Sequence, residues 1–553
     1  MYKQVLDPVG NSLGWSSLVA VLPLVTLFVL LGGFKVKAWW AALASLAVAI
    51  IVAVAVYSMP FGQTMDSAAE GAVFGFFPIM WIVINAVWIY NMTRETGDFA
   101  TLQRSFSAVT PDQRVQAVII AFSFGALLEA LAGFGTPVAI CSVMLMGLGF
   151  KPVKAATVSL VANTAPVAFG AIAIPIVTLS ELTGLPKHDV GAMVGRQTPF
   201  LALIVPLILI AIVDGRRGLR QAWPAALVGG STFAVLQFAT SNYISVELTD
   251  IIASLGSAAA IVALTRVWQP AEPGEGRFAG PRPAVAGASV HSPTLEREVQ
   301  RRERTGGTPA EVLRAYAPYL VIIAVLAIAQ IGPVKNALES VTKEFNWPGL
   351  HVLNGKGEAP SSVVFKFNYL SSAGTLLLIS GLLTMPILRV GPLRAARIYG
   401  ATLNQLKTAI ITVMAVLALA YVMNLSGQTI TLGTWAAGAG GFFAFLSPLI
   451  GWLGTAITGS DTSSNSLFGV LQVTAAKNAH LNSTLLAASN SSGGVCAKMV
   501  SPQNLAIGAA AVGMAGQEGE LFRKVIGWSL LLVLLLAGLA YLQSLSALSW
   551  MVP

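Results

Sequence analysis

Apolar stretches near 20 residues long recur along this chain, and they constrain its fold more than any other feature. A helix of about 20 residues crosses the hydrocarbon core of a bilayer, where only helices and closed barrels satisfy their backbone hydrogen bonds. Charged residues make up 10% of the 553 residues, against about 25% in a typical soluble chain. We therefore expect an all-α polytopic membrane protein with about 12 to 14 membrane segments.

Loop charges predict how the chain is oriented, because Lys and Arg gather in cytoplasmic loops. Lys35 and Lys37 place the first loop in the cytoplasm and the N-terminus outside. Asp66 and Glu70 are assigned to the next, external loop, and Arg114 to the cytoplasmic loop that follows. The uninterrupted spans are predicted at Leu18–Leu31, Trp39–Tyr57, Val73–Met92, Pro199–Val213, Trp223–Phe238, Ile251–Leu264, Thr308–Ile331, Gly374–Leu388, Ile410–Asn424 and Phe522–Leu548.

Several classes of function are disfavoured by the sequence. The net charge of +9 resides in short loops rather than in a basic domain with interleaved aromatic residues, which argues against nucleic-acid binding. Cys141 and Cys496 are interpreted as core residues, and no metal or cofactor is expected. An intramembrane enzyme needs a nucleophile with a base or metal ligands, yet none of the four histidines lies in an interrupted apolar segment. A channel remains a rival hypothesis, which accumulation of substrate against a gradient would exclude.

The apolar stretch at residues 115–150 is interrupted, and it predicts a re-entrant hairpin. Glu129 and the run Gly133–Pro137 lie inside it. Glycine favours open backbone and proline lacks an amide donor, so a helix ends there. The two half-length helices would enter and leave on the cytoplasmic side, although two tilted full spans are the alternative. A discontinuous helix, residues 158–178, follows with its break at Asn163–Pro166.

A second interrupted pair lies near the C-terminus. Residues 440–470 are broken at Gly459–Asn465, a run of hydroxyls with one carboxylate and one amide. Residues 485–512 are broken around Asn490–Gly494. Because unpaired polar groups are costly in hydrocarbon, the Gly459–Asn465 run predicts a hairpin tip in a protein-lined, partly wet cavity. The alternative is a connecting loop at the level of the lipid headgroups.

The two interrupted pairs match in spacing. The tip-to-asparagine step is 30 residues in the first pair and 31 in the second, from Gly133 to Asn163 and from Gly459 to Asn490. A proline follows each asparagine by 12 residues. Matched broken segments in two halves are typical of transporters built from repeats. We therefore expect an internal repeat.

The predicted organisation follows from this repeat. Residues 1–268 would form the N-terminal membrane repeat, 269–307 a disordered cytoplasmic linker, and 308–553 the C-terminal membrane repeat. The second hairpin is entered from the uncharged and hence external Gly427–Thr434 segment. The repeats would then be inverted, with both hairpin tips near the middle of the membrane.

A broken helix frees backbone amides that attract anions, and neutral donors surround both predicted breaks. Such a site suits a small carboxylate that also carries a hydroxyl. Lys498 could supply a cation, but pairing with Asp461 or Glu129, or snorkelling, is the alternative. For the hydroxyl residues, helix packing is the alternative to ligation. The candidate substrate-binding residues are Gly135, Thr136, Asn163, Thr164, Ser460, Thr462, Ser463, Asn490, Ser491, Ser492 and Lys498.

Glu129 and Asp461 are the candidate proton-coupling residues. Burial favours the neutral form of a carboxyl and so lets it carry a proton. Importing one anion against an inside-negative potential costs about 2.3 kcal/mol per 100 mV, and one co-transported proton removes that cost. Glu129 could instead bond freed backbone amides, and Asp461 could help bind sodium. A sodium-coupled carrier of another small carboxylate is therefore the alternative function.

Several of these motifs closely resemble the L-lactate permease family. They are Phe122–Ile140 (FSFGALLEALAGFGTPVAI), Asn163–Ala171 (NTAPVAFGA), Gly459–Asn465 (GSDTSSN) and Lys498–Gln503 (KMVSPQ). The similarity covers nearly the whole chain. It implies a multi-pass proton symporter for L-lactate in the bacterial plasma membrane, with D-lactate and glycolate as further substrates. Thr136 departs from the alanine common in the family. The oligomeric state stays open.

Overall fold

The computed structural model describes residues 1–34, 36–107, 109–110, 112–131, 133, 135–271, 308–329, 331–354, 357–360, 363–514 and 517–553. Within these ranges, ten helices are long and apolar enough to cross a membrane, or up to eleven when one bent pair counts as a span. Two shorter apolar helices accompany them. The predicted helical membrane fold is confirmed. The predicted linker, residues 269–307, lies outside the described residues after residue 271.

The first half of the chain forms α-helices, with π-helical turns at η1, η2 and η3 and a 3₁₀ turn at η4. In order these are α1 (Leu13–Ala20), α2 (Leu22–Phe28), η1 (Val29–Gly33), α3 (Ala38–Ala55), α4 (Phe61–Phe74), η2 (Gly75–Met80), α5 (Trp81–Glu95), α6 (Asp98–Ser107), α7 (Gln113–Gln116), η3 (Ala117–Phe124), α8 (Gly125–Leu131), α9 (Thr136–Gly147), α10 (Pro152–Ala162), η4 (Val167–Phe169), α11 (Gly170–Thr183), α12 (Lys187–Val194), α13 (Thr198–Tyr243) and α14 (Thr249–Val267).

The second half is also helical, with 3₁₀ turns at η6, η7 and η8. It comprises α16 (Pro309–Ala329), α17 (Gly332–Glu339), α18 (Ala373–Ile387), α19 (Pro392–Ser426), α20 (Gln428–Ala436), η6 (Ala437–Phe442), α21 (Phe443–Thr458), α22 (Asp461–Asn478), α23 (Ser483–Ala497), η7 (Lys498–Val500), α24 (Pro502–Ala511), α25 (Glu518–Ser544) and η8 (Ser549–Met551).

Within the described residues, four short strands lie toward one end of the molecule. These strands are β1 (Tyr2–Lys3), β2 (Lys343–Asn346), β3 (Val352–Leu353) and β4 (Val364–Phe367). The pair β1 and β3 is parallel, with Tyr2 opposite Val352, and β2 and β4 are antiparallel. The Tyr2 hydroxyl donates to the carbonyl of Ser426 at 2.8 Å. These bonds hold the N-terminus against the end of α19.

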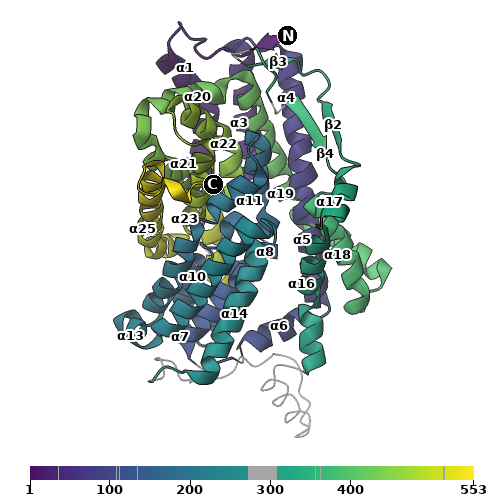
Figure 1. The fold of residues 1–553 in the computed structure, drawn as a ribbon, viewed down its shortest axis with the longest axis vertical. Coiled ribbons are helices and arrows are strands. Elements are labelled where there is room, and N and C mark those ends of the chain that lie inside the picture. The colour runs from purple at the N-terminus through teal and green to yellow at the C-terminus, as the bar shows by residue number, and fades with distance from the viewer. Residues whose placement is uncertain are drawn as a thin grey trace.

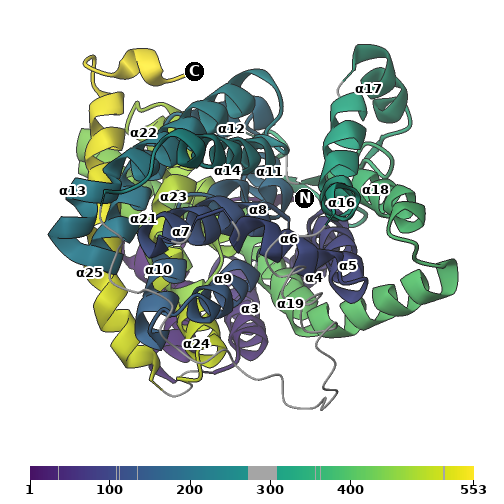
Figure 2. The ribbon, with the colours of Figure 1, turned by 90° about the horizontal axis from the view of Figure 1, so that it is seen from below.

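The helices form a broad body and a smaller group beside it (Figure 1). The body contains α10, α11, α21, α22 and α23, with α25 and α13 at its outer side, as Figure 2 also shows. The smaller group contains α5, α16, α17 and α18 on the opposite side. The long helix α19 contacts α3, α4, α5 and α22, so it connects the two parts.

Asp66 and Glu70 both lie in α4, so their predicted place in an external loop is wrong. Glu70 is 0% exposed and has no hydrogen-bond partner for either carboxylate oxygen within the described chain. A Cβ on the neighbouring Gly71 would lie 2.5 Å from the Leu417 carbonyl oxygen. The small residues of α4 let it pack closely against α19, which buries a carboxyl that hydropathy alone assigns to a loop.

The first interrupted pair contains two glycines with left-handed backbone. Gly133 (φ +51°) and Gly135 (φ +81°) lie between α8 and α9, where they turn the chain back on itself. Glycine adopts these angles without the steric cost of a Cβ. The next two helices, α10 and α11, are bent by 66° across a break of at most four residues. This break includes Asn163 and Thr164.

The second pair differs from the prediction in one respect. Gly459 (φ +77°) separates α21 from α22, but α23 runs unbroken through Asn490–Gly494. The break lies later, at Lys498–Ser501. Pro502 explains its place, since proline lacks the amide donor and keeps the preceding residue extended. The predicted break at Asn490–Gly494 is therefore wrong. The glycines of this run allow α23 to pack closely on its neighbour instead, since a Cβ on Gly493 would lie 2.0 Å from the Pro448 carbonyl oxygen.

Arg114 is buried, which corrects its assignment as an orienting charge in a loop. Its side chain is 0% exposed and forms ion pairs with Asp112 at 2.7 Å and Asp214 at 3.0 Å. It also donates to the Gln221 amide oxygen at 2.7 Å. Asp214 lies at the interruption inside α13, next to Gly215 (φ +59°). The guanidinium therefore connects the start of α7 to the bend of α13.

We expect Arg114→Met to lower the free energy of unfolding by about 3–5 kcal/mol, because it leaves two carboxylates without their cation. Thermal or denaturant unfolding of the purified protein in detergent measures the loss. Arg394→Met is the matched control. The Arg394 ion pair with Glu95 spans 3.8 Å and both side chains are about half exposed, so its loss should cost less than about 1 kcal/mol. Equal effects of the two substitutions would contradict a structural role for the Arg114 cluster.

Candidate functional site

A cavity of about 600 Å³ lies where the predicted repeats meet. It receives side chains from both interrupted pairs and from α3 and α19. Its floor is buried and its mouth is exposed: Glu129, Asp461 and Lys498 are each at most 6% exposed, whereas Lys37, Thr408 and Gln503 are exposed. Its lining residues are Lys37, Ala38, Trp39, Glu129, Gly133, Val167, Gly170, Ala171, Ile174, Pro175, Thr408, Ala409, Thr412, Val413, Thr458, Gly459, Ser460, Asp461, Thr462, Ser463, Lys498 and Gln503.

An ion pair between Lys498 and Glu129 forms part of the cavity floor. Of the alternatives open for Lys498, the structure therefore contains the pair with Glu129. The two residues are 369 positions apart, one in α8 and the other at the break between α23 and α24. The second carboxylate oxygen of Glu129 has no hydrogen-bond partner in the described part of the chain. Buried charges of this kind are costly unless paired, so each residue depends on the other.

Asp461 is the first residue of α22 and lies at the second hairpin tip. The Ser491 hydroxyl donates to its Oδ2 at 2.6 Å, and the Thr455 hydroxyl donates to its Oδ1 at 3.5 Å. The N-terminus of α22 also favours negative charge at this position. Ser460 caps the same helix by accepting from the amide of Ser463 at 3.3 Å. The tip therefore places the Asp461 carboxylate beside several hydroxyl groups.

Each of the two carboxyls rests against a glycine of the broken helix in its own half. A Cβ on Gly170 would lie 2.9 Å from Glu129 Oε1, and a Cβ on Gly494 would lie 2.1 Å from Asp461 Oδ1. Both distances are too short for a real side chain. The two interrupted pairs therefore share an arrangement in which a helix glycine makes room for a hairpin carboxyl.

Amide side chains connect the two predicted repeats next to Pro175, which lines the cavity. The Asn465 amide donates to the carbonyl of Pro175 at 3.1 Å, and the Asn490 amide donates to Asn465 Oδ1 at 2.9 Å. The Gln472 amide in turn donates to Asn490 Oδ1 at 3.0 Å. All three of these amide side chains are 0% exposed. This network fixes the start of α22 against α11.

The backbone of α11 is left-handed near the cavity. Ala171, Ile172 and Ala173 have φ angles of +45°, +59° and +58°. Such angles cost non-glycine residues roughly 1–2 kcal/mol each, and close packing holds them here, since all three are at most 7% exposed. Ala171 lines the cavity. The strained turn directs the chain past Glu129 just after Gly170.

The structure places the predicted site residues in two groups. Those that line the cavity are Glu129, Asp461, Ser460, Thr462, Ser463 and Lys498. Those outside its described lining are Gly135, Thr136, Asn163, Thr164, Asn490, Ser491 and Ser492. Asn490 and Ser491 bond Asn465 and Asp461 from the unbroken part of α23. Gly135 contacts α24 instead, where a Cβ would lie 3.1 Å from Asn504 Oδ1.

Residues that sequence reasoning missed also line the cavity. Lys37 was interpreted only through its effect on orientation, and Thr408 and Thr412 lie on a helix with no polar interruption. Gln503 ends the KMVSPQ motif, which is a signal that could have identified it. The Cβ of Gln503 lies 3.1 Å from the position of a Cβ on Gly459. Gln503 therefore packs directly on the second tip.

Another buried carboxyl, Asp250, is linked to the first broken helix by hydrogen bonds. The Gln237 amide donates to Asp250 Oδ1 at 3.0 Å and to the carbonyl of Ala165 at 3.4 Å. The Thr198 hydroxyl donates to Gln237 Oε1 at 3.0 Å. Asp250 is 1% exposed. This network supports the break between α10 and α11, and its side chains are outside the described lining of the cavity.

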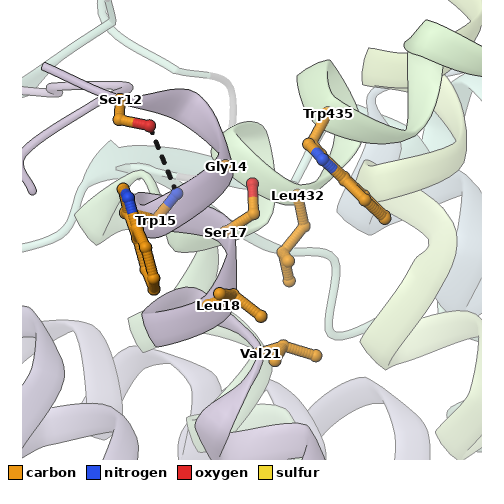
Figure 3. Close-up of a pocket in the computed structure, with 8 residues that line it drawn as sticks. All are labelled: Ser12, Gly14, Trp15, Ser17, Leu18, Val21, Leu432 and Trp435. Atoms are coloured by element: carbon orange, nitrogen blue, oxygen red, sulfur yellow. Dashed lines mark hydrogen bonds between the residues drawn. The ribbon is translucent and has the colours of Figure 1, made fainter.

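A separate cavity of about 520 Å³ lies between α1 and α20 (Figure 3). Trp15 and Trp435 stand at its two sides, and Leu18, Val21 and Leu432 lie between them. Its described lining contains no ionisable side chain. It therefore offers no oppositely charged side chain to a charged substrate. Among the described residues, no group of three or more His, Cys, Asp or Glu side chains could hold a metal ion.

Comparisons with known proteins agree with the motifs. The family model described as L-lactate permease matches residues 16–545. The glycolate permease GlcA of Escherichia coli K12 is 41% identical over 98% of both chains. The L-lactate permeases of Bacillus subtilis 168 and Escherichia coli K12 are each 41% identical over 100% of both chains. Among solved structures, the chain aligns with MtrF of Neisseria gonorrhoeae, an antimetabolite efflux pump, with a TM-score of 0.47 and 13% identity over 87% of this chain and 84% of that one.

Proposed function

Because this chain belongs to the L-lactate permease family, we propose that it is a secondary active transporter that imports L-lactate with a proton. D-lactate and glycolate are proposed as further substrates, and the bacterial inner membrane as its location. One observation supports this proposal above all. A buried ion pair, Glu129 with Lys498, lies in a cavity between the two predicted repeats.

Exchange of ion-pair partners would couple the proton to the substrate. Protonation of Glu129 removes the anion that holds Lys498, and the lysine can then bind the substrate carboxylate. With both ligands bound, Lys498 again has one anionic partner, because the substrate carboxylate replaces Glu129. A proton or a carboxylate alone would leave one charge unbalanced, which costs several kcal/mol in a buried site. The two ligands should therefore bind together.

The second hairpin tip supplies groups for the rest of the substrate. Ser460, Thr462 and Ser463 present hydroxyls that can donate to a carboxylate or accept from an α-hydroxyl. Asp461, held by Ser491, can accept from that hydroxyl as well. A 2-hydroxy acid would then bridge the cation of the floor and the tip of α22.

The same exchange would affect the relation between the two halves. Glu129 belongs to the predicted N-terminal repeat and Lys498 to the C-terminal one, so their pair ties the repeats together. Its release on binding would let the repeats rearrange around the occupied site, as in other carriers with a central binding site. Symport of one proton with one monocarboxylate moves no net charge, and the pH gradient then drives accumulation.

Reconstitution in proteoliposomes tests the proposal. We expect labelled L-lactate to accumulate when the outside is acidified, independently of sodium, and excess glycolate to compete. A proton ionophore should abolish the accumulation. Accumulation that requires a sodium gradient and ignores the pH gradient would favour the sodium-coupled alternative. Equilibration without accumulation would indicate a channel.

A further inference from the structure

Lys37 is the second cation of the cavity and carries no assigned role. It immediately precedes α3 and lines the cavity together with Ala38 and Trp39. Unlike Lys498, it is exposed. Among the described residues, no ion pair or hydrogen bond engages its ammonium group.

Both carboxylates of the cavity already have other partners. Glu129 is paired with Lys498, and Asp461 accepts from Ser491 and Thr455. Across the described lining, Glu129 and Asp461 are the only acidic residues. Lys37 is therefore a cation that faces a cavity whose own anions are engaged. A ligand anion would complete its coordination.

The usual interpretation of a lysine near a helix end is that it orients the chain or reaches the lipid headgroups. Because Lys37 also lines the cavity, it can in addition contact a substrate there. The exposed residues Lys37, Thr408 and Gln503 form the mouth, and the buried pair of Glu129 and Lys498 forms part of the floor. A carboxylate that moves between the floor and this mouth passes the paired cation of Lys498 and the unpaired cation of Lys37.

We propose that Lys37 is a substrate-binding residue at the predicted cytoplasmic mouth of the cavity, where it binds the carboxylate of a monocarboxylate that moves between Lys498 and the cytoplasm. This inference rests on the proposed transport function and extends it. The free ammonium of Lys37 binds the anion without any proton uptake. The substrate carboxylate moves between Lys37 and Lys498 only while Glu129 is protonated. Lys37 thus holds substrate at the cytoplasmic mouth and leaves the coupling step to the buried pair.

Uptake by purified variants, in proteoliposomes whose predicted cytoplasmic mouth faces the added lactate, tests this role. Lys37→Ala should raise the KM for lactate offered on that face about five- to tenfold with little change in the maximal rate, as expected for loss of a partly exposed charge-assisted contact. Added salt should weaken lactate uptake by the wild type more than uptake by Lys37→Ala, because salt screens an exposed cation. Lys37→Arg should keep KM within about twofold of the wild-type value.

Lys407→Ala is the matched control. Lys407 is also exposed and lies one residue before Thr408, but its ammonium donates to Asn404 at 3.1 Å and it is outside the described lining of the cavity. Its loss should leave KM unchanged. An equal rise in KM in both variants would show a general surface-charge effect and would overturn the proposal, as would a wild-type KM in Lys37→Ala.

A second measurement does not depend on transport by the variant. Lys37→Cys should react with a negatively charged thiol reagent, and saturating lactate should slow that reaction, while Lys407→Cys should show no protection. The native Cys141 and Cys496 are both buried, at 1% and 0% exposure. Absence of protection at position 37 would overturn the role of Lys37. Failure of the wild-type protein to take up lactate or glycolate would instead refute the proposed function itself.

Discussion

Replacing Glu129 by glutamine should abolish proton-driven accumulation of lactate while lactate–lactate exchange across the membrane continues. Glutamine resembles the protonated carboxyl, so Lys498 would stay free to bind the substrate but no proton could leave with it. Net uptake requires that proton to be released on the inside, whereas exchange does not. Labelled lactate followed under a pH step and under counterflow in the same proteoliposomes separates the two activities.

The ion-pair partner supplies the control. Glu129→Gln leaves the charge of Lys498 without an anionic partner. Lactate should therefore raise the unfolding temperature of this variant more than that of the wild type, because the ligand restores the missing anion. The double variant Glu129→Gln/Lys498→Met removes both buried charges and should fold. It should nevertheless lose exchange as well as uptake. Undiminished accumulation by Glu129→Gln at neutral pH would remove this residue from the coupling mechanism.

Replacing Asp461 by asparagine should also abolish lactate uptake. The carboxylate accepts hydrogen bonds from Ser491 and Thr455 at the start of α22. Asparagine keeps the size but offers one acceptor oxygen instead of two, and it removes the charge that the helix N-terminus favours. Initial uptake rates, measured with the amount of folded protein in the vesicles, test this expectation. Uptake at the wild-type rate would be incompatible with a role of Asp461 in binding or coupling.

A glycine substitution separates the effect of the position of the Asp461 carboxyl on uptake from the effect of its charge. Gly494→Ala keeps Asp461 but places a Cβ 2.1 Å from its Oδ1 and 2.7 Å from the Thr455 hydroxyl, so the carboxylate must move. We expect Gly494→Ala to lower lactate uptake, as Asp461→Asn does. Gly538→Ala in α25 is the control, because a Cβ there would meet no atom of the described structure within 4 Å. Equal activity of both alanine variants would show that the position of Asp461 is unimportant.

The sequence predicted several parts of this structure correctly because they depend on local chemistry. Long apolar stretches predict membrane helices whatever their neighbours are. Helix breaks at Gly133, Gly135 and Gly459 follow from the open backbone that glycine favours, and in the structure all three glycines have positive φ. The two carboxyls of the cavity, Glu129 and Asp461, were identified by their position in interrupted apolar segments. The inverted orientation of the repeats and the roles of these carboxyls in transport stay predictions.

Other features could not be predicted, since they depend on which distant segments pack together. The sequence left three roles open for Lys498, and only the approach of α8 to η7 selects Glu129 as its partner. Hydropathy assigned Glu70 to a loop, but packing of α4 on α19 buries it. Gly493 and Gly494 predict a helix break, but in the structure they allow close packing within the continuous helix α23. The break lies instead just before Pro502.

What this chain's sequence determines by itself is its class and its motifs: a helical membrane protein of the L-lactate permease family with polar interruptions in apolar segments. Helix formation in lipid is a local requirement of the backbone, so it needs no knowledge of neighbours. The tertiary structure alone decides which charges meet. Lys37 reaches the cavity mouth, and Lys498 pairs with Glu129 across 369 positions. An ion pair depends on distances in space, and hydropathy and spacing along the chain do not encode them.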